Sequence, residues 1–139
     1  MTAPTSGRLE WAAIWKPALS MSVFLLPLGI LQQVLVDDDT IDGGGSASLL
    51  FFALFLFLAA VCGFGAARLA SARLLEHGAA AAALAYAIVQ VVGIVRRLAV
   101  GDDIASPIGY AFLAISMATC GMLGAMLERR ARRLEALRS

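Results

Sequence analysis

Charged residues are so sparse that four long runs of the chain contain none. The runs cover 17–36, 48–67, 78–95 and 107–127, and they are continuously apolar rather than alternating between apolar and polar positions. Because a helix rises about 1.5 Å per residue, runs of this length cross the roughly 30 Å hydrocarbon layer of a bilayer. Lipid offers the backbone no hydrogen-bonding partner, which favours helices over open strands. The pattern predicts an all-α integral membrane protein, a four-transmembrane-helix bundle that forms a single domain over 1–139.

Residues at the ends of these runs agree with helix boundaries. Ser106 and Pro107 form a good helix start, with serine as the N-cap and proline at the first helical position. Three glycines at 43–45 predict a turn between the first two spans. Glu128 and Arg132 are spaced as an i,i+4 pair. We therefore expect the basic tail, 128–139, to continue the fourth helix.

The charges at the two ends of the spans are distributed unequally. On the side of both termini, nine basic residues accompany four acidic ones, whereas the opposite side has two arginines and six aspartates. Because Arg and Lys collect on the cytoplasmic side of membrane proteins, we expect both termini to be cytoplasmic. The nine basic residues are Arg8, Lys16, Arg68, Arg73, Arg129, Arg130, Arg132, Arg133 and Arg138.

The composition narrows the classes of function. Apolar residues make up 60% of the chain and charged residues 15%, against roughly 45–50% and about 25% in soluble domains. These values exclude a soluble enzyme, and they give no reason to expect a nucleic-acid partner. The spans contain no Asp, Glu, Lys, Arg or His, and such groups usually mark proton and ion pathways in membranes. We expect no enzymatic activity, no metal and no cofactor.

The single histidine and the two cysteines lack the neighbours that catalysis or metal binding needs. His77 stands at the start of the third span without a serine–histidine–acid set, so we expect a surface or helix-capping role. Cys62 and Cys120 have no further ligands nearby, and a reducing cytoplasm disfavours a disulfide. We expect both cysteines to be small packing residues.

Polar residues near the outer ends of the spans form the strongest candidate site. They would line an outward-facing patch that binds an anion or docks a partner. Two alternatives remain open: glutamines that only bond neighbouring helices, and arginines that pair with the aspartates of a short loop or reach the outer headgroups. The candidate outer polar patch comprises Gln32, Gln33, Gln90, Arg96, Arg97, Asp102 and Asp103.

Small residues recur every four positions along the last three spans. Such stripes let helix backbones approach closely, either within the bundle or between protomers. The stripes are Ala59, Gly63 and Ala67, then Ala79, Ala83 and Ala87, then Ser116, Cys120 and Gly124. We expect helix packing above all at Ala59, Gly63, Ala67, Cys120 and Gly124.

The basic tail carries four arginines beside the expected headgroup region. Arginines there attract anionic lipid by roughly 1 kcal/mol each. One interpretation is a topology anchor, and the other is a contact surface for anionic lipid or for a cytoplasmic partner. The residues concerned are Arg129, Arg130, Arg132 and Arg133.

The two halves of the chain show a faint internal similarity. The segment 60–63, Ala-Val-Cys-Gly, matches 118–121, Ala-Thr-Cys-Gly, and Gln33-Val34 matches Gln90-Val91 at nearly the same offset. A true repeat would make two tandem helical hairpins related by a pseudo-twofold axis, with the second and fourth helices facing each other. Chance similarity in an Ala- and Leu-rich sequence is the alternative.

The stretch from Cys62 to Arg97 is the least generic part of the chain. It contains Gly63-Phe64-Gly65-Ala66-Ala67-Arg68, then His77-Gly78-Ala79, then Val89-Gln90-Val91-Val92-Gly93 before Arg96-Arg97. This arrangement resembles small four-helix bacterial membrane proteins to which no activity is assigned. The resemblance implies a bacterial inner-membrane location, in line with the excess of Arg over Lys, and implies no chemistry.

These features support two hypotheses of function. The first is a non-enzymatic accessory or scaffolding subunit of a membrane assembly, in contact with lipid and with other membrane proteins or further copies of itself. The alternative is an oligomeric small transporter or channel, with the outer polar patch as its mouth.

Overall fold

The computed structural model describes residues 9–101, 103 and 106–138, which form four α-helices and the loops between them. The helices are α1 (Trp11–Asp37), α2 (Ser46–Leu69), α3 (Leu74–Val100) and α4 (Pro107–Ala136). Each is long and apolar enough to cross a membrane. Many of their large apolar side chains are exposed on the outside of the bundle, where lipid would cover them. By the composition of its helices, this is a multi-pass membrane protein.

The helices extend beyond the uncharged runs that predict them. α1 begins six residues before its run, and α4 continues nine residues past its run to Ala136. An uncharged run measures the hydrocarbon layer, whereas a helix can continue into the headgroup region, where water satisfies its charged side chains. In the tail, Glu128 accepts a hydrogen bond from Nε of Arg132 at 3.1 Å, so the expected i,i+4 pair forms.

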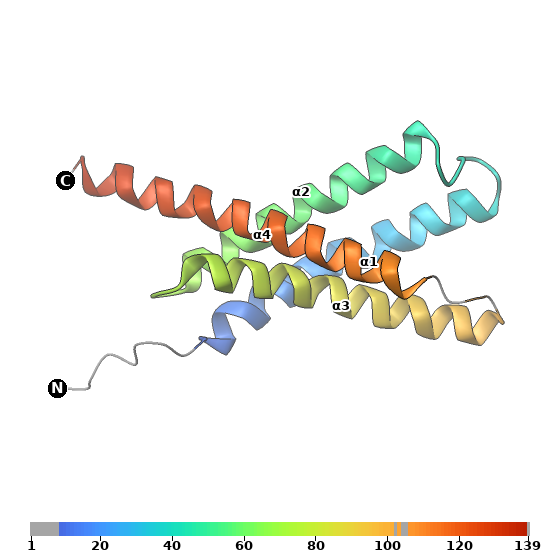
Figure 1. Ribbon diagram of the computed structural model, residues 1–139, viewed down its shortest axis with the longest axis horizontal. Helices are drawn as coiled ribbons and strands as arrows, with labels where there is room; N and C mark the ends of the chain where they lie inside the picture. Colours follow the sequence, from blue (N-terminus) through green and yellow to red (C-terminus); the bar gives the residue numbers. More distant parts are fainter. Residues whose placement is uncertain (1–8, 102, 104–105, 139) are drawn as a thin grey trace.

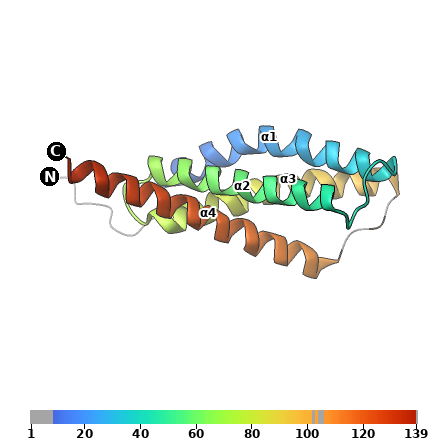
Figure 2. The same cartoon turned by 90° about the horizontal axis from the view of Figure 1, so that it is seen from above.

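The middle of the bundle consists of α2 and α3. Each of these two helices contacts all three others, whereas α1 and α4 flank the pair and make no contact with each other in the described segments. The start of α1 and the end of α4 lie at the same end of the bundle (Figures 1 and 2). We call this the inner end and its opposite the outer end, following the orientation expected from the charges.

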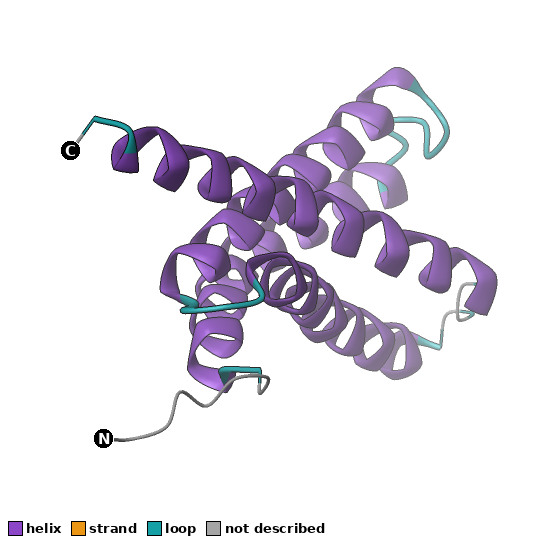
Figure 3. Cartoon of the chain, turned by 60° about the vertical axis from the view of Figure 1, so that its left-hand side comes forward, coloured by secondary structure: helices purple, strands orange, loops and turns teal. Residues whose placement is uncertain are grey.

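Four glycines hold α2, α3 and α4 together toward the inner end, where α4 crosses the other helices (Figure 3). A Cβ atom on Gly63 would overlap the backbone carbonyl of Gly121, and one on Gly124 would overlap that of Ala60. A Cβ on Gly78 would lie 2.7 Å from the Cβ of Ala125. The helices are thus in backbone contact, as small residues permit in membranes. We call Gly63, Gly78, Gly121 and Gly124 the glycine crossing.

Other residues of the expected stripes lie at the same contact, with one exception. Ala59 and Ala67 are buried, and Cys120 packs against the core. The stripe expected on α3 does not pack within the bundle, because Ala79 and Ala83 are only half-buried and Ala87 is exposed. Contact between protomers through this stripe stays a prediction. The residues of α3 that pack are Gly78, Ala81, Ala82 and Ala85. Both faces of α3 are rich in alanine, so the spacing of alanines alone did not identify the packed one.

The packing departs from the pseudo-twofold symmetry that an internal repeat would require. Gly63 and Gly121, which occupy matching positions of the two similar segments, do contact each other. Symmetry would also make the contact between α2 and α3 recur between α4 and α1. The described residues show the first contact and not the second.

Candidate functional site

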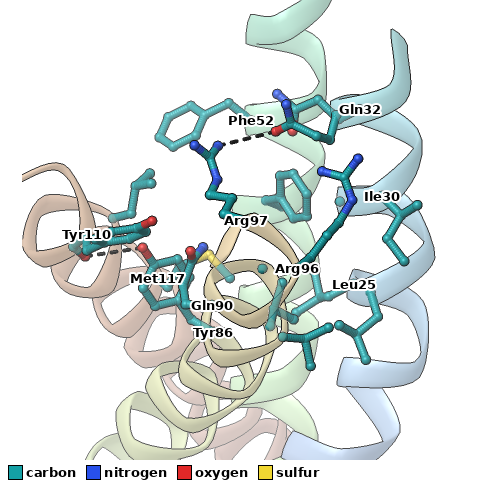
Figure 4. A pocket seen from close by; sticks show the side chains of 18 residues that line it. Leu25, Ile30, Gln32, Phe52, Tyr86, Gln90, Arg96, Arg97, Tyr110 and Met117 are labelled. Carbon is teal, nitrogen blue, oxygen red and sulfur yellow. Dashed lines mark hydrogen bonds between the residues drawn. The ribbon is translucent and has the colours of Figure 1, made fainter. Parts of the chain in front are cut away.

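A pocket of about 370 Å³ opens in the outer half of the bundle, between the diverging helices (Figures 1 and 4). Residues of all four helices line it, most of them from α1 and α3. Its floor consists of Leu25, Tyr86 and Met117, whose side chains are buried. Apolar side chains cover the walls above the floor: Leu26, Ile30, Phe52, Phe55, Val89, Val92 and Leu113.

Two glycines leave space in the facing walls of this pocket. Gly29 of α1 and Gly93 of α3 both line it. A Cβ on Gly29 would meet only ordinary van der Waals neighbours, the nearest being Cζ of Phe55 at 3.8 Å, and a Cβ on Gly93 would meet no atom within 4 Å. Unlike the glycine crossing, these positions do not need glycine for helix contact. The volume of the pocket therefore depends on side chains that are absent from both walls.

Five residues of the candidate outer polar patch line this pocket, four of them near its mouth and Gln90 about one helical turn above the floor. Gln32, Gln33, Gln90, Arg96 and Arg97 all line it, together with Tyr110. Figure 4 shows both arginines extending from α3 across the opening. The backbone carbonyl of Tyr110 accepts a hydrogen bond from the hydroxyl of Tyr86 at 3.2 Å. That contact joins α3 to α4 beside the pocket.

The two arginines at the mouth have different partners. Nη2 of Arg96 lies 3.5 Å from Oδ2 of Asp37, which forms a long ion pair at the half-exposed rim. Arg97 forms no ion pair with any described residue; it donates to the backbone carbonyl of Asp103 at 3.2 Å and to Oε1 of Gln33 at 3.4 Å. The mouth thus carries one cationic charge more than the described carboxylates neutralise.

This arrangement differs from the expected pairing with the aspartates of the short outer loop. Asp103 contacts Arg97 through its backbone carbonyl rather than its carboxylate, and Asp102 lies outside the described residues. The carboxylate that pairs with Arg96 comes from α1, 59 positions away in the chain. Such long-range contacts cannot be inferred from adjacency in the sequence.

The glutamines also divide into two kinds. Gln33 donates to Oδ1 of Asp37 at 2.7 Å and accepts from Arg97, so it links α1 to α3 as an interhelical hydrogen bond would. Gln32 and Gln90 line the pocket without a hydrogen bond to another described residue. Their amides are therefore available to a molecule in the pocket.

A second polar cluster joins the start of α1 to the start of α3 at the inner end. Nε2 of His77 accepts a hydrogen bond from the backbone N–H of Glu10 at 2.8 Å, and Nδ1 lies 3.0 Å from the backbone carbonyl of Arg73. The Glu10 carboxylate accepts hydrogen bonds from the hydroxyl and backbone N–H of Ser71. We call Glu10, Ser71, Arg73 and His77 the inner cap.

Of the two roles expected for His77, a surface group or a helix cap, the contacts of the inner cap match the second. His77 is only 1% exposed, and its ring caps the first turn of α1, a helix whose N-cap side chain makes no capping bond of its own. The hydroxyl of Ser71, then its backbone N–H and then the neighbouring His77 lower the pKa of Glu10 from its ordinary value of 4.5.

The four arginines of the tail also have different surroundings. Arg132 donates to the backbone carbonyls of Ala67 at 2.7 Å and Arg68 at 3.0 Å, in the last turn of α2, and pairs with the buried Glu128. The negative end of the α2 dipole also stabilises a cation at this position. Arg129, Arg130 and Arg133 are exposed, and they border a shallow groove with Leu75, Leu123, Met126 and Leu127. These three remain available for headgroups or a partner, whereas Arg132 binds α2.

Within the described segments, no three His, Cys, Asp or Glu side chains are grouped as a metal site. Cys62 is buried, and Cys120 is half-buried beside the core.

The chain matches no protein-family model, no curated protein and no solved structure. The structure supports the architecture alone: four long apolar helices packed as a bundle.

Proposed function

We propose that this protein binds a small, partly apolar molecule in the outer pocket and serves as a binding or transport component of a bacterial cytoplasmic membrane. The proposal rests on one observation. Residues far apart in the chain line a single pocket, with an apolar floor, Gln90 in its wall, and Gln32, Gln33, Arg96 and Arg97 around its mouth. Ligand sites typically combine an apolar cavity with a few polar groups that orient the ligand.

The size of the pocket supports a binding site over a packing defect. Protein interiors leave few voids larger than one water molecule, whereas this pocket has a volume of about 370 Å³. That volume is within the usual range of small-molecule sites, roughly 300–1,000 Å³. Gly29 and Gly93 keep it open on facing walls.

The closed inner half favours a binding state over an open channel. Below the pocket, the glycine crossing brings the backbones of α2, α3 and α4 into contact. A molecule that enters from the outer side would stop above this contact. Transport would require the helices to separate at the crossing, so the described conformation corresponds to an outward-open state.

The same feature favours a second candidate, an accessory subunit of a larger membrane assembly. A pocket closed on its inner side suits a subunit that captures a ligand and passes it to a partner. Native mass spectrometry after mild detergent extraction separates the two candidates. A stoichiometric complex with other membrane proteins favours the accessory subunit, and a discrete homo-oligomer favours transport.

The proposed pocket is tested by a cysteine in its wall. In a background with Cys62→Ala and Cys120→Ala, Gly93→Cys places a thiol where a Cβ meets no atom within 4 Å. We expect an impermeant methanethiosulfonate reagent to modify this thiol from the outer side in intact cells. Added 1-decanol, a neutral amphiphile, should slow the reaction. The matched unreactive position is tested in a second variant that carries Cys120→Ala alone and so keeps Cys62, which is 1% exposed. An unreactive Gly93→Cys would overturn the proposal.

A further inference from the structure

We infer that the outer pocket selects amphipathic monoanions: molecules with a carboxylate or phosphate-ester head that binds at Arg97 and an apolar body that extends to the pocket floor. The inference rests on the proposed function, because it names the class of ligand for that site.

The first argument is charge. Arg96 and Arg97 both line the pocket, and Asp37 pairs with Arg96 alone. The described residues supply no carboxylate to Arg97. A guanidinium stays protonated in proteins, so a half-buried one that pairs with no described carboxylate attracts an anion. One uncompensated charge matches a monoanion.

The second argument is hydrogen-bonding capacity. Both terminal nitrogens of Arg97 donate to neutral acceptors, and the hydrogen bond from Nη2 to Gln33 is long at 3.4 Å. A guanidinium has five N–H donors in a planar fork that fits a carboxylate or phosphate in a bidentate manner, with bonds about twice as strong as neutral ones. An incoming anion would therefore gain a stronger contact than the one it displaces from Gln33. The amide of Gln90, which has no partner among the described residues, provides a further polar group lower in the pocket, about one helical turn above Tyr86.

The third argument is the shape of the space below Arg97. Along α3, Tyr86 at the floor and Arg97 at the mouth are eleven positions apart, which corresponds to about 16 Å of helix. The side chains between these two levels are largely apolar. At about 30 Å³ per water-sized group, a pocket of 370 Å³ holds roughly a dozen non-hydrogen atoms. A medium-length acyl or aromatic acid fits both dimensions.

The acidic outer loop does not remove this preference. Asp38 and Asp39 are exposed in the loop between α1 and α2, where water and salt screen them over about 8–10 Å. Arg97 is half-buried, so its field inside the pocket is less screened. The loop charges slow the approach of an anion, and the pocket charge stabilises it once bound.

The test compares anionic and cationic thiol reagents at one position. In the Gly93→Cys background, we measure the reaction rates of sulfonatoethyl and trimethylammonioethyl methanethiosulfonate. The reference is Gly44→Cys in the outer loop, where an added side chain also meets no atom within 4 Å. We expect the anion-to-cation rate ratio to be about tenfold higher in the pocket. Arg97→Gln should abolish the difference, whereas Arg133→Gln, at the inner end, should leave it unchanged.

Protection of this thiol by added ligands identifies the chemical class of the ligand and whether its anionic head belongs to a lipid or to a free acid. We expect decanoate to slow modification of Gly93→Cys at lower concentration than 1-decanol, and decyltrimethylammonium to be weaker than both. The measurement is made in zwitterionic phosphatidylcholine bilayers and repeated in bilayers that contain phosphatidylglycerol. Protection by phosphatidylglycerol without added decanoate assigns the head to a lipid, and protection by decanoate alone assigns it to a free acid.

The outcomes separate this inference from the proposed function. Equal rate ratios in the pocket and in the loop, with decanol protecting as well as decanoate, would overturn the anion preference and leave the pocket intact. A ratio that persists in Arg97→Gln would also overturn it, because another group would then carry the preference. A Gly93→Cys thiol that reacts with neither reagent would overturn the proposed function itself.

Discussion

Glycine has two opposite roles in this bundle, and the surroundings of each residue decide which applies. At Gly63 a side chain would overlap the backbone of the facing helix, so glycine permits contact. At Gly93 a side chain would enter open space, so glycine leaves volume for something else. The sequence shows the same residue type in similar apolar surroundings at both positions.

This contrast predicts opposite responses to the same substitution. Gly63→Ala should lower the free energy of unfolding by about 2 kcal/mol or more, because α2 and α4 must move apart to admit the methyl group. Gly93→Ala should be neutral or slightly stabilising, since alanine is the better helix former. Reversible unfolding in mixed micelles measures both. Equal losses of stability in the two variants would contradict the packing described for the glycine crossing.

His77 is predicted to fix the first turn of α1. His77→Ala removes the acceptor of the Glu10 N–H and the ring that contacts the Arg73 carbonyl. Each hydrogen bond contributes about 1 kcal/mol, and we expect hydrogen exchange of the Glu10 amide to accelerate roughly tenfold. Ser71→Ala is the matched control, because Ser71 bonds the carboxylate of Glu10 rather than its N–H. Unchanged exchange in His77→Ala would show that α1 begins without this cap.

The contact between Glu10 and Ser71 predicts a pH dependence. Because the folded-state pKa of Glu10 is lowered from 4.5, the contact stabilises the fold above that pH and is lost as the pH falls through the lowered value. The difference in Tm between the native chain and Ser71→Ala should therefore be constant near neutral pH and shrink below pH 4.5. A difference that persists at low pH would contradict the assignment.

At the scale of elements, the extension of α4 is a structural part of the bundle. Arg132 joins it to the last turn of α2, and Glu128 is buried beneath that contact. The arginines next to it, Arg129, Arg130 and Arg133, remain exposed. Removal of Arg132 should therefore affect the stability of the fold, whereas removal of one of the three exposed arginines should not.

Arg132→Gln is predicted to destabilise the fold by about 1–2 kcal/mol. The variant loses charge-assisted hydrogen bonds to α2 and leaves the buried Glu128 carboxylate without its partner. Partial exposure of Arg132 to solvent keeps the effect modest. Arg133→Gln, which removes the same charge one position away, should change Tm little. Thermal unfolding in detergent compares the two, and equal shifts would show that only the charge of the tail matters.

The elements could be predicted from the sequence because the bilayer fixes their length. Uncharged runs located all four helices, and the spacing of Glu128 and Arg132 predicted the extension of α4. The partners of side chains could not be predicted in this way. The buried His77 accepts a hydrogen bond from the backbone N–H of Glu10, 67 positions earlier, and Arg132 bonds a helix end more than 60 positions away. The outer polar residues were apparent, but the pocket between them depends on how far the helices diverge.

At the scale of the whole molecule, both described ends of the chain lie at one end of the bundle (Figure 2). Together with the charge distribution, this arrangement predicts that the inner end faces the cytoplasm. Gly44→Cys in the outer loop should react with an impermeant maleimide in intact cells, and Leu137→Cys, whose side chain site is 83% exposed, should react only after permeabilisation. The reverse pattern would invert the orientation and place the pocket mouth in the cytoplasm.

The glycine crossing divides α2 at Gly63 into a long outer segment and a short inner segment. From Gly63, the helix extends about 26 Å to Ser46 at the outer end and about 9 Å to Leu69 at the inner end. With the crossing as fulcrum, a tilt of α2 moves its outer end about three times as far as its inner end. Arg132 is hydrogen-bonded to the short inner segment, at Ala67 and Arg68. A displacement of an ångström at that contact would therefore move the outer end of α2, which carries the wall residues Phe52 and Phe55 of the pocket, by about 3 Å.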